Sequence, residues 1–146
     1  MVEKEAYPTS AEKDKAIVSR LFEEIMKGNL AVADELILED YAQHSVFGIL
    51  NGREAFKQFF ITFASAVPDA HFEIEDVIAK GDKVVTRLTV SGTQTGELQG
   101  ILSTGKKFSM KGIAIFRVVD GNIVEHWDAV DQLGMLQELG VIPMPS

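Results

Sequence analysis

The hydrophobic period of this chain changes once, near Ala70, and that change most constrains its fold. Before it, apolar residues recur every three or four positions, as they do on amphipathic helices. After it, they alternate with polar residues, as in His71–Glu75, which is typical of a half-buried strand. Because helices come first and strands follow with no βαβ alternation, the sequence predicts an α+β domain rather than a doubly wound α/β domain.

Three helices are predicted in the first half of the chain. The first begins after Thr9, which precedes Glu12 at the spacing of a capping box. A short second helix is expected over 30–38, and 40–52 is expected to be a loop. The third begins near residue 52 and ends before Pro68, because proline cannot continue a helix. One side of this third helix carries four aromatic rings: Phe56, Phe59, Phe60 and Phe63.

About four long strands are predicted after residue 70, followed by a last helical turn or two over 133–139. The segment 96–106 holds three glycines and is expected to be a loop with a kink or bulge. Asp120-Gly121-Asn122 is a strong hairpin turn. The strands are expected at His71–Glu75, Lys83–Thr95, Lys107–Val119 and Ile123–Val130.

A single long antiparallel sheet has to twist, and helices packed on it leave a hollow between the two layers. The predicted architecture is therefore a cone-shaped, curved antiparallel sheet with the N-terminal helices on its concave face. It forms one domain over 9–142, preceded by a flexible tail at 1–8. The hollow is where a small-molecule site is expected.

Composition excludes several functions. The chain has no cysteine, so disulfides, thiolate nucleophiles and cysteine-based zinc sites are absent. The net charge of −8 opposes binding to phosphate backbones, so no nucleic-acid partner is expected. No apolar run approaches the roughly 18 residues of a membrane span, and the first eight residues lack a signal-peptide core, so a cytoplasmic protein is expected.

No metal or other cofactor is expected either. The three histidines, His44, His71 and His126, are scattered, with no His-x-His or His-Glu-x-x-His spacing. The glycines of the 96–106 segment match neither the dinucleotide fingerprint nor the phosphate-binding loop. Any chemistry would then have to come from ordinary side chains.

Alternation along the last predicted strand places two ionisable side chains on one face. His126 and Asp128 point the same way as Val124 and Val130, while Ile123, Glu125, Trp127 and Ala129 point the other way. An ionisable pair between apolar residues is what a catalytic pair in a hydrophobic cavity would look like. Desolvation there would raise the pKa of Asp128 above its reference value of about 3.9 and make it a better base near neutral pH. The alternative is a polar patch on an exposed or subunit-contacting face.

Three further residues are candidates for binding a substrate. His44 lies in the predicted 40–52 loop, where a histidine is either solvated or functional. Arg87 lies in the middle of a strand, where it either faces solvent or binds a carboxylate or enolate. Asp131 stands where a helix N-cap belongs, which by itself explains an aspartate, so Asp128 and Asp131 both remain candidates for the chemistry.

Several segments together resemble a known family: Tyr41-x-x-His44, Gly52–Phe56, Thr93–Gly100, Ile115–Asp131 and Leu133–Gly140. The resemblance covers roughly 10–140 and is to the SnoaL-like polyketide cyclases of the nuclear-transport-factor-2-like superfamily. It implies a cone-shaped α+β barrel and a cofactor-free acid/base catalyst of an intramolecular aldol closure, with a buried aspartate that handles a proton beside a carbonyl. Relatives often carry histidine where this chain has Gln94.

The leading hypothesis is an enzyme that cyclises or isomerises a small hydrophobic carbonyl compound. Asp128 would act as base and then as acid, with His126 and Arg87 stabilising the enolate. A ligand-binding or dimerisation module without turnover is the first alternative. An epoxide or ester hydrolase, in which Asp128 and Arg87 position water, is the second. The outer face of the sheet, which carries Trp127, is expected to pack against a second subunit as a homodimer.

Overall fold

The computed structural model describes residues 9–45 and 48–144, so the tail predicted at 1–8 lies outside the described residues. Four helices and six strands follow one another along this part of the chain. The helices are α1 (Ser10–Met26), α2 (Val32–Leu36), α3 (Arg53–Ala66) and α4 (Gln132–Glu138). The strands are β1 (Ile37–Ser45), β2 (Gly48–Asn51), β3 (His71–Lys80), β4 (Lys83–Thr93), β5 (Lys107–Val119) and β6 (Asn122–Val130).

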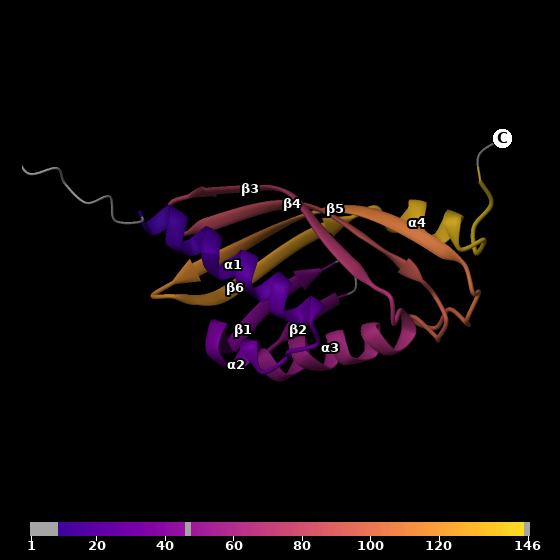
Figure 1. The fold of residues 1–146 in the computed structure, drawn as a ribbon, viewed down its shortest axis with the longest axis horizontal. Coiled ribbons are helices and arrows are strands. Elements are labelled where there is room, and N and C mark those ends of the chain that lie inside the picture. Colours follow the sequence, from indigo (N-terminus) through magenta and orange to yellow (C-terminus); the bar gives the residue numbers. More distant parts are fainter. Residues whose placement is uncertain (1–8, 46–47, 145–146) are drawn as a thin grey trace, which may run out of the picture.

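All six strands form one sheet, in the order β2-β1-β6-β5-β4-β3. The sheet curves over the N-terminal helices, and α1, α2 and α3 lie on its concave side (Figure 1). Strands β3 to β6 form the antiparallel meander that the alternating pattern predicts. Helix α1 has the predicted Thr9–Glu12 capping box and buries one apolar stripe against the sheet. The predicted α+β architecture is confirmed.

The prediction of a loop over 40–52 is wrong, because β1 and β2 occupy most of this segment. β1 pairs with β6 in parallel, so the sheet is mixed rather than purely antiparallel. Exposed Glu39 and Asp40 interrupt the apolar alternation of β1, and two of its inward side chains, Gln43 and Ser45, are polar. A strand whose inner face is partly polar lacks the hydrophobic signal by which strands are recognised.

The alternation observed on β6 differs from the predicted one, because the strand contains a β-bulge. Val118 pairs with Ile123 whereas Arg117 pairs with Glu125, so Val124 is the extra residue. As a result Ile123, predicted to face outward, is fully buried in the core. His126, beyond the bulge, faces inward as predicted.

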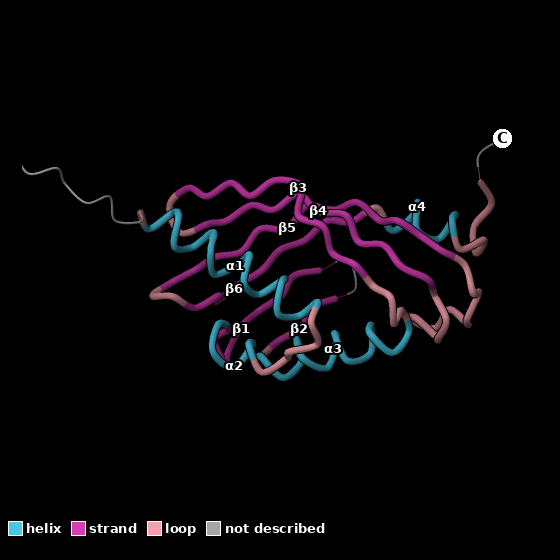
Figure 2. The backbone as a smooth tube through the Cα atoms, viewed as in Figure 1, coloured by secondary structure: helices cyan, strands magenta, loops and turns pink. Residues whose placement is uncertain are grey.

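The loop 94–106 is held against the end of α3. The side chain of Gln94 is fully buried and donates to the backbone oxygen of Ile101 at 3.0 Å, while Thr104 donates to its Oε1 at 2.8 Å. The N–H groups of Thr95 and Gly96 both donate to the carbonyl of Ala66. Figure 2 shows this loop beside the C-terminal end of α3. The amide of Gln94 therefore has a structural role.

Among the residues that the structure describes, no helix is long and apolar enough to cross a membrane.

Candidate active site

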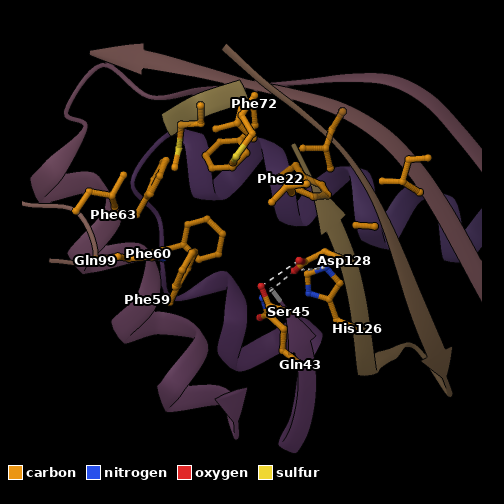
Figure 3. Close-up of a pocket in the computed structure, with 18 residues that line it drawn as sticks. Phe22, Gln43, Ser45, Phe59, Phe60, Phe63, Phe72, Gln99, His126 and Asp128 are labelled. Atoms are coloured by element: carbon orange, nitrogen blue, oxygen red, sulfur yellow. Dashed lines mark hydrogen bonds and ion pairs between the residues drawn. The ribbon is translucent and has the colours of Figure 1, made fainter. Parts of the chain in front are cut away.

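A cavity of about 90 Å³ lies between the concave face of the sheet and helices α1 and α3. Aromatic rings line one side of it, and polar side chains from β1 and β6 line the other (Figure 3). The polar side consists of Gln43, Ser45, His126 and Asp128. The aromatic side consists of Phe22, Phe59, Phe60, Phe63 and Phe72, so most of the phenylalanine stripe predicted on the third helix faces this space.

Asp128 projects into this cavity with its side chain only 12% exposed. Ser45 Oγ donates to Oδ1 at 3.0 Å, and Gln43 Nε2 lies 3.3 Å from Oδ2 and donates to it. These donors reach the carboxylate because β1 runs alongside β6, with Gln43 opposite His126 in the register. A carboxylate taken out of water is stable when hydrogen-bond donors replace its hydration, and β1 supplies them.

His126 lies beside Asp128, with 3.8 Å between its Nε2 and the Oδ2 of Asp128. Its ring stacks on Phe116 at a centroid distance of 4.3 Å, and its Nδ1 lies 2.9 Å from the hydroxyl of Tyr41. Burial, and to a smaller extent the nearby charge of His44, lowers the pKa of His126 to about 3. His126 is therefore neutral at physiological pH, which excludes it as a cationic stabiliser of an enolate.

Tyr41 lies behind the polar side of the cavity and does not reach its surface. Its side chain is 1% exposed, and its hydroxyl donates to Gln43 Oε1 at 2.8 Å. Burial, and then the charge of Asp128, raises the pKa of Tyr41 well above its usual value of 10.0. The phenol therefore stays protonated and acts as a hydrogen-bonding link between β1 and β6.

The structure places the three predicted substrate-binding residues outside the cavity. His44 Nε2 lies 2.9 Å from a Glu125 carboxylate oxygen, and its ring stacks on Trp127 on the opposite face of the sheet. Asp131 caps α4, with its Oδ1 accepting from the N–H of Gly134 at 2.9 Å.

Arg87 also lies outside the cavity, because it alternates with the buried residues Thr86 and Leu88 and so points away from the concave face. Its Nε lies 2.7 Å from Asp76 Oδ2, and both side chains are more than half exposed. The predicted roles of Arg87 in holding an enolate, or in positioning water with Asp128, are corrected by this placement.

Tyr41, Gln43 and Ser45 were not predicted to belong to the site, because β1 was predicted to be a loop. Their spacing of two residues could have predicted that they lie together, since residues two apart share one face of a strand. In the structure all three point from β1 toward His126 and Asp128. Within residues 9–45 and 48–144, no group of three histidine, aspartate or glutamate side chains is placed to hold a metal ion.

The fold and the site together define a class: a cone-shaped α+β protein whose apolar cavity carries one hydrogen-bonded carboxylate beside a neutral imidazole. The family model described as SnoaL-like polyketide cyclase matches residues 16–139. This match spans most of the chain. The chain belongs to the SnoaL-like polyketide cyclase family.

Similar proteins agree with this assignment. Aklanonic acid methyl ester cyclase DauD of Streptomyces sp. (strain C5) is 32% identical over 89% of this chain and 83% of its own length. Nogalonic acid methyl ester cyclase of Streptomyces nogalater is 33% identical over 73% of this chain and 82% of its own length. The solved structure of TsrD from Streptomyces laurentii superposes with a TM-score of 0.84 at 28% identity, over 92% of this chain and 99% of that one.

Proposed function

We propose that this protein is a cofactor-free cyclase that closes a ring in a small, hydrophobic polyketide by an intramolecular aldol reaction. The observation that carries the proposal is the Asp128 carboxylate, which faces phenylalanine rings across a mostly apolar cavity. Two of the relatives named above are an aklanonic acid methyl ester cyclase and a nogalonic acid methyl ester cyclase, which supports ring closure as the reaction here.

Asp128 carries the proton in this proposal. Its carboxylate removes a proton from the carbon next to a substrate carbonyl, and the electron pair of the broken C–H bond forms the enolate. The enolate carbon attacks a second carbonyl carbon of the same molecule, which forms the new C–C bond and an alkoxide. The alkoxide takes the proton back from Asp128, so the enzyme returns to its starting state and no external oxidant or reductant is needed.

Ser45 and Gln43 would hold the carboxylate in place during these steps, since each donates to one of its oxygens. After the first proton transfer, the Asp128 carboxylic acid can donate a hydrogen bond to the enolate. Neither His126, which is neutral, nor Arg87, which lies on the opposite face, supplies a positive charge to the cavity. The proposed reaction is therefore driven by a carboxyl group alone, in surroundings of low polarity.

The test is turnover of aklanonic acid methyl ester by Asp128→Asn, with Asp131→Asn as the matched control. Asp128→Asn keeps the size of the side chain but removes the base, and should lower kcat at least 100-fold while the protein stays folded. Asp131→Asn keeps a good N-cap outside the cavity and should leave kcat within about twofold. Equal loss in both variants, or no loss in Asp128→Asn, would contradict the proposed role.

We further propose that the protein is a homodimer whose subunits contact each other through the convex face of the sheet. We also propose that it is cytoplasmic, a compartment that the absence of cysteine favours. An apolar row crosses the convex face in register from strand to strand, through Ile78, Val85, Ile115 and Trp127. Light scattering during size-exclusion chromatography should give twice the chain mass, and Ile115→Glu should give the monomer. A monomer for the unaltered chain at micromolar concentration would end the dimer proposal.

A further inference from the structure

Asp128 is one end of a chain of hydrogen bonds that runs through Gln43 and Tyr41 to His126. The carboxylate at this end sets which group donates and which accepts along the chain. The Asp128 carboxylate only accepts hydrogen bonds, so the amide of Gln43 turns its Nε2 toward Oδ2, at 3.3 Å. The Oε1 of Gln43 then faces Tyr41 and accepts the single proton of its hydroxyl, at 2.8 Å. The hydroxyl oxygen of Tyr41 is left as an acceptor for its remaining neighbour, Nδ1 of His126, at 2.9 Å.

This direction determines which nitrogen of His126 carries the proton. A neutral imidazole has one N–H, and only an Nδ1–H can donate to the Tyr41 oxygen. The lone pair of the ring is therefore on Nε2. Among the described residues, that atom is buried and has no hydrogen-bond partner. Gln43 and Tyr41 thus connect the carboxylate of Asp128 to Nδ1 of His126 through hydrogen bonds.

The unpartnered Nε2 and the carboxylate stand side by side on the cavity wall (Figure 3). His126 Nε2 lies 3.8 Å from Asp128 Oδ2, which is too long for a hydrogen bond between them and short enough for one donor oxygen to lie within hydrogen-bonding distance of both. Two acceptors this close together are stabilised by a proton donor that lies between them.

We infer that Tyr41 and Gln43 are positioning residues that hold His126 as the Nδ1–H tautomer, so that His126 Nε2 and Asp128 Oδ2 form a two-acceptor site. This site selects ligands that present a hydroxyl, such as an enol or a phenol, over ligands of the same shape that present a ketone or an ether. The inference deepens the proposed function. It rests on that function only where it takes such a ligand to be the substrate. Neither the tautomer nor the selectivity requires turnover.

Two measurements on the free, full-length protein test the inference without any reaction. The first is the tautomer of His126, read from two-dimensional ¹H–¹⁵N spectra of the imidazole nitrogens and assigned with His126→Asn. The expected spectrum has a protonated Nδ1 and an unprotonated Nε2. A protonated Nε2 in the unaltered protein overturns the inference, and this result does not depend on any variant folding.

The second measurement is the ratio of the Kd values of anisole and phenol, titrated by NMR. The unaltered protein should bind phenol about tenfold more tightly than its methyl ether, because phenol brings a hydroxyl proton to the two-acceptor site and the ether has none. Tyr41→Phe keeps the ring and its edge contact with Phe56 but removes the oxygen that orients Nδ1–H, and should bring the ratio toward one. Gln43→Leu should act in the same direction.

Thr86→Val is the matched control, because it also removes one buried hydroxyl, here the donor to the carbonyl of Ala114. It should leave both the phenol preference and the His126 tautomer unchanged. A ratio near one in the unaltered protein, or an unchanged ratio and tautomer in Tyr41→Phe, overturns the inference. If Asp128→Asn kept full turnover while phenol selectivity held, the proposed function would fail and the two-acceptor site would stand.

Discussion

The burial of His126 predicts a loss of stability in mild acid that a single substitution should remove. Its pKa is about 3 in the folded chain, against 6.5 for an ordinary histidine. Between these two pH values the unfolded chain binds a proton that the folded chain does not, so the free energy of unfolding falls as the pH falls. Each pH unit below 6.5 costs about 1.4 kcal/mol, which gives a loss of about 2 kcal/mol between pH 7 and pH 5.

The assay is urea unfolding followed by far-ultraviolet circular dichroism, for the unaltered protein and His126→Asn across pH 5 to 7. Asparagine does not titrate, and its amide N–H can still donate to Tyr41. Carboxylates such as Glu125 titrate in both proteins and cancel in the comparison. The unaltered protein should lose about 2 kcal/mol more than the variant. Parallel curves for the two proteins would refute the reasoning, because they would mean that folded His126 accepts its proton as readily as the unfolded chain.

Two further predictions follow from the position of side chains relative to the cavity. Arg87→Ala should change the free energy of unfolding by less than about 1 kcal/mol and leave kcat unaltered, because its pair with Asp76 is exposed; a tenfold fall in kcat would place Arg87 at the substrate. Phe60 lines both the cavity and a second hollow of about 460 Å³ at the ends of α1 and α3, as do Phe63 and Phe72. Phe60→Ala should join the two spaces, cost up to about 3 kcal/mol in stability and strengthen binding of 1-naphthol relative to phenol; unchanged relative affinity would show that the ring is not the barrier.

Local pattern was sufficient for most of the secondary structure. The change of period near Ala70 predicted helices followed by a meander, and the bounds predicted for β5, Lys107–Val119, are those of the structure. Alternation also predicted that His126 and Asp128 share a face, because side chains two apart on a regular strand point the same way. These features depend on neighbouring residues alone.

Other features depended on partners far away in the chain. β1 was not predicted as a strand because its inner face is partly polar. Its polar side chains donate hydrogen bonds to Asp128 of β6, a partner that the sequence of β1 does not reveal. Arg87 lies on the convex face of the sheet because the helices cover the other face of β4. The sequence of β4 alone does not determine which of its two faces the helices cover.

The sequence by itself determined the order of elements, the α+β class and the pairing of a carboxylate with an imidazole on one strand. Only the tertiary structure decided that this pair faces an apolar cavity and that Tyr41 links it to β1. The reason is physical: Tyr41 and His126 are 85 residues apart, so the hydrogen bond between them exists only when β1 and β6 lie side by side. Local periodicity carries no information on that pairing.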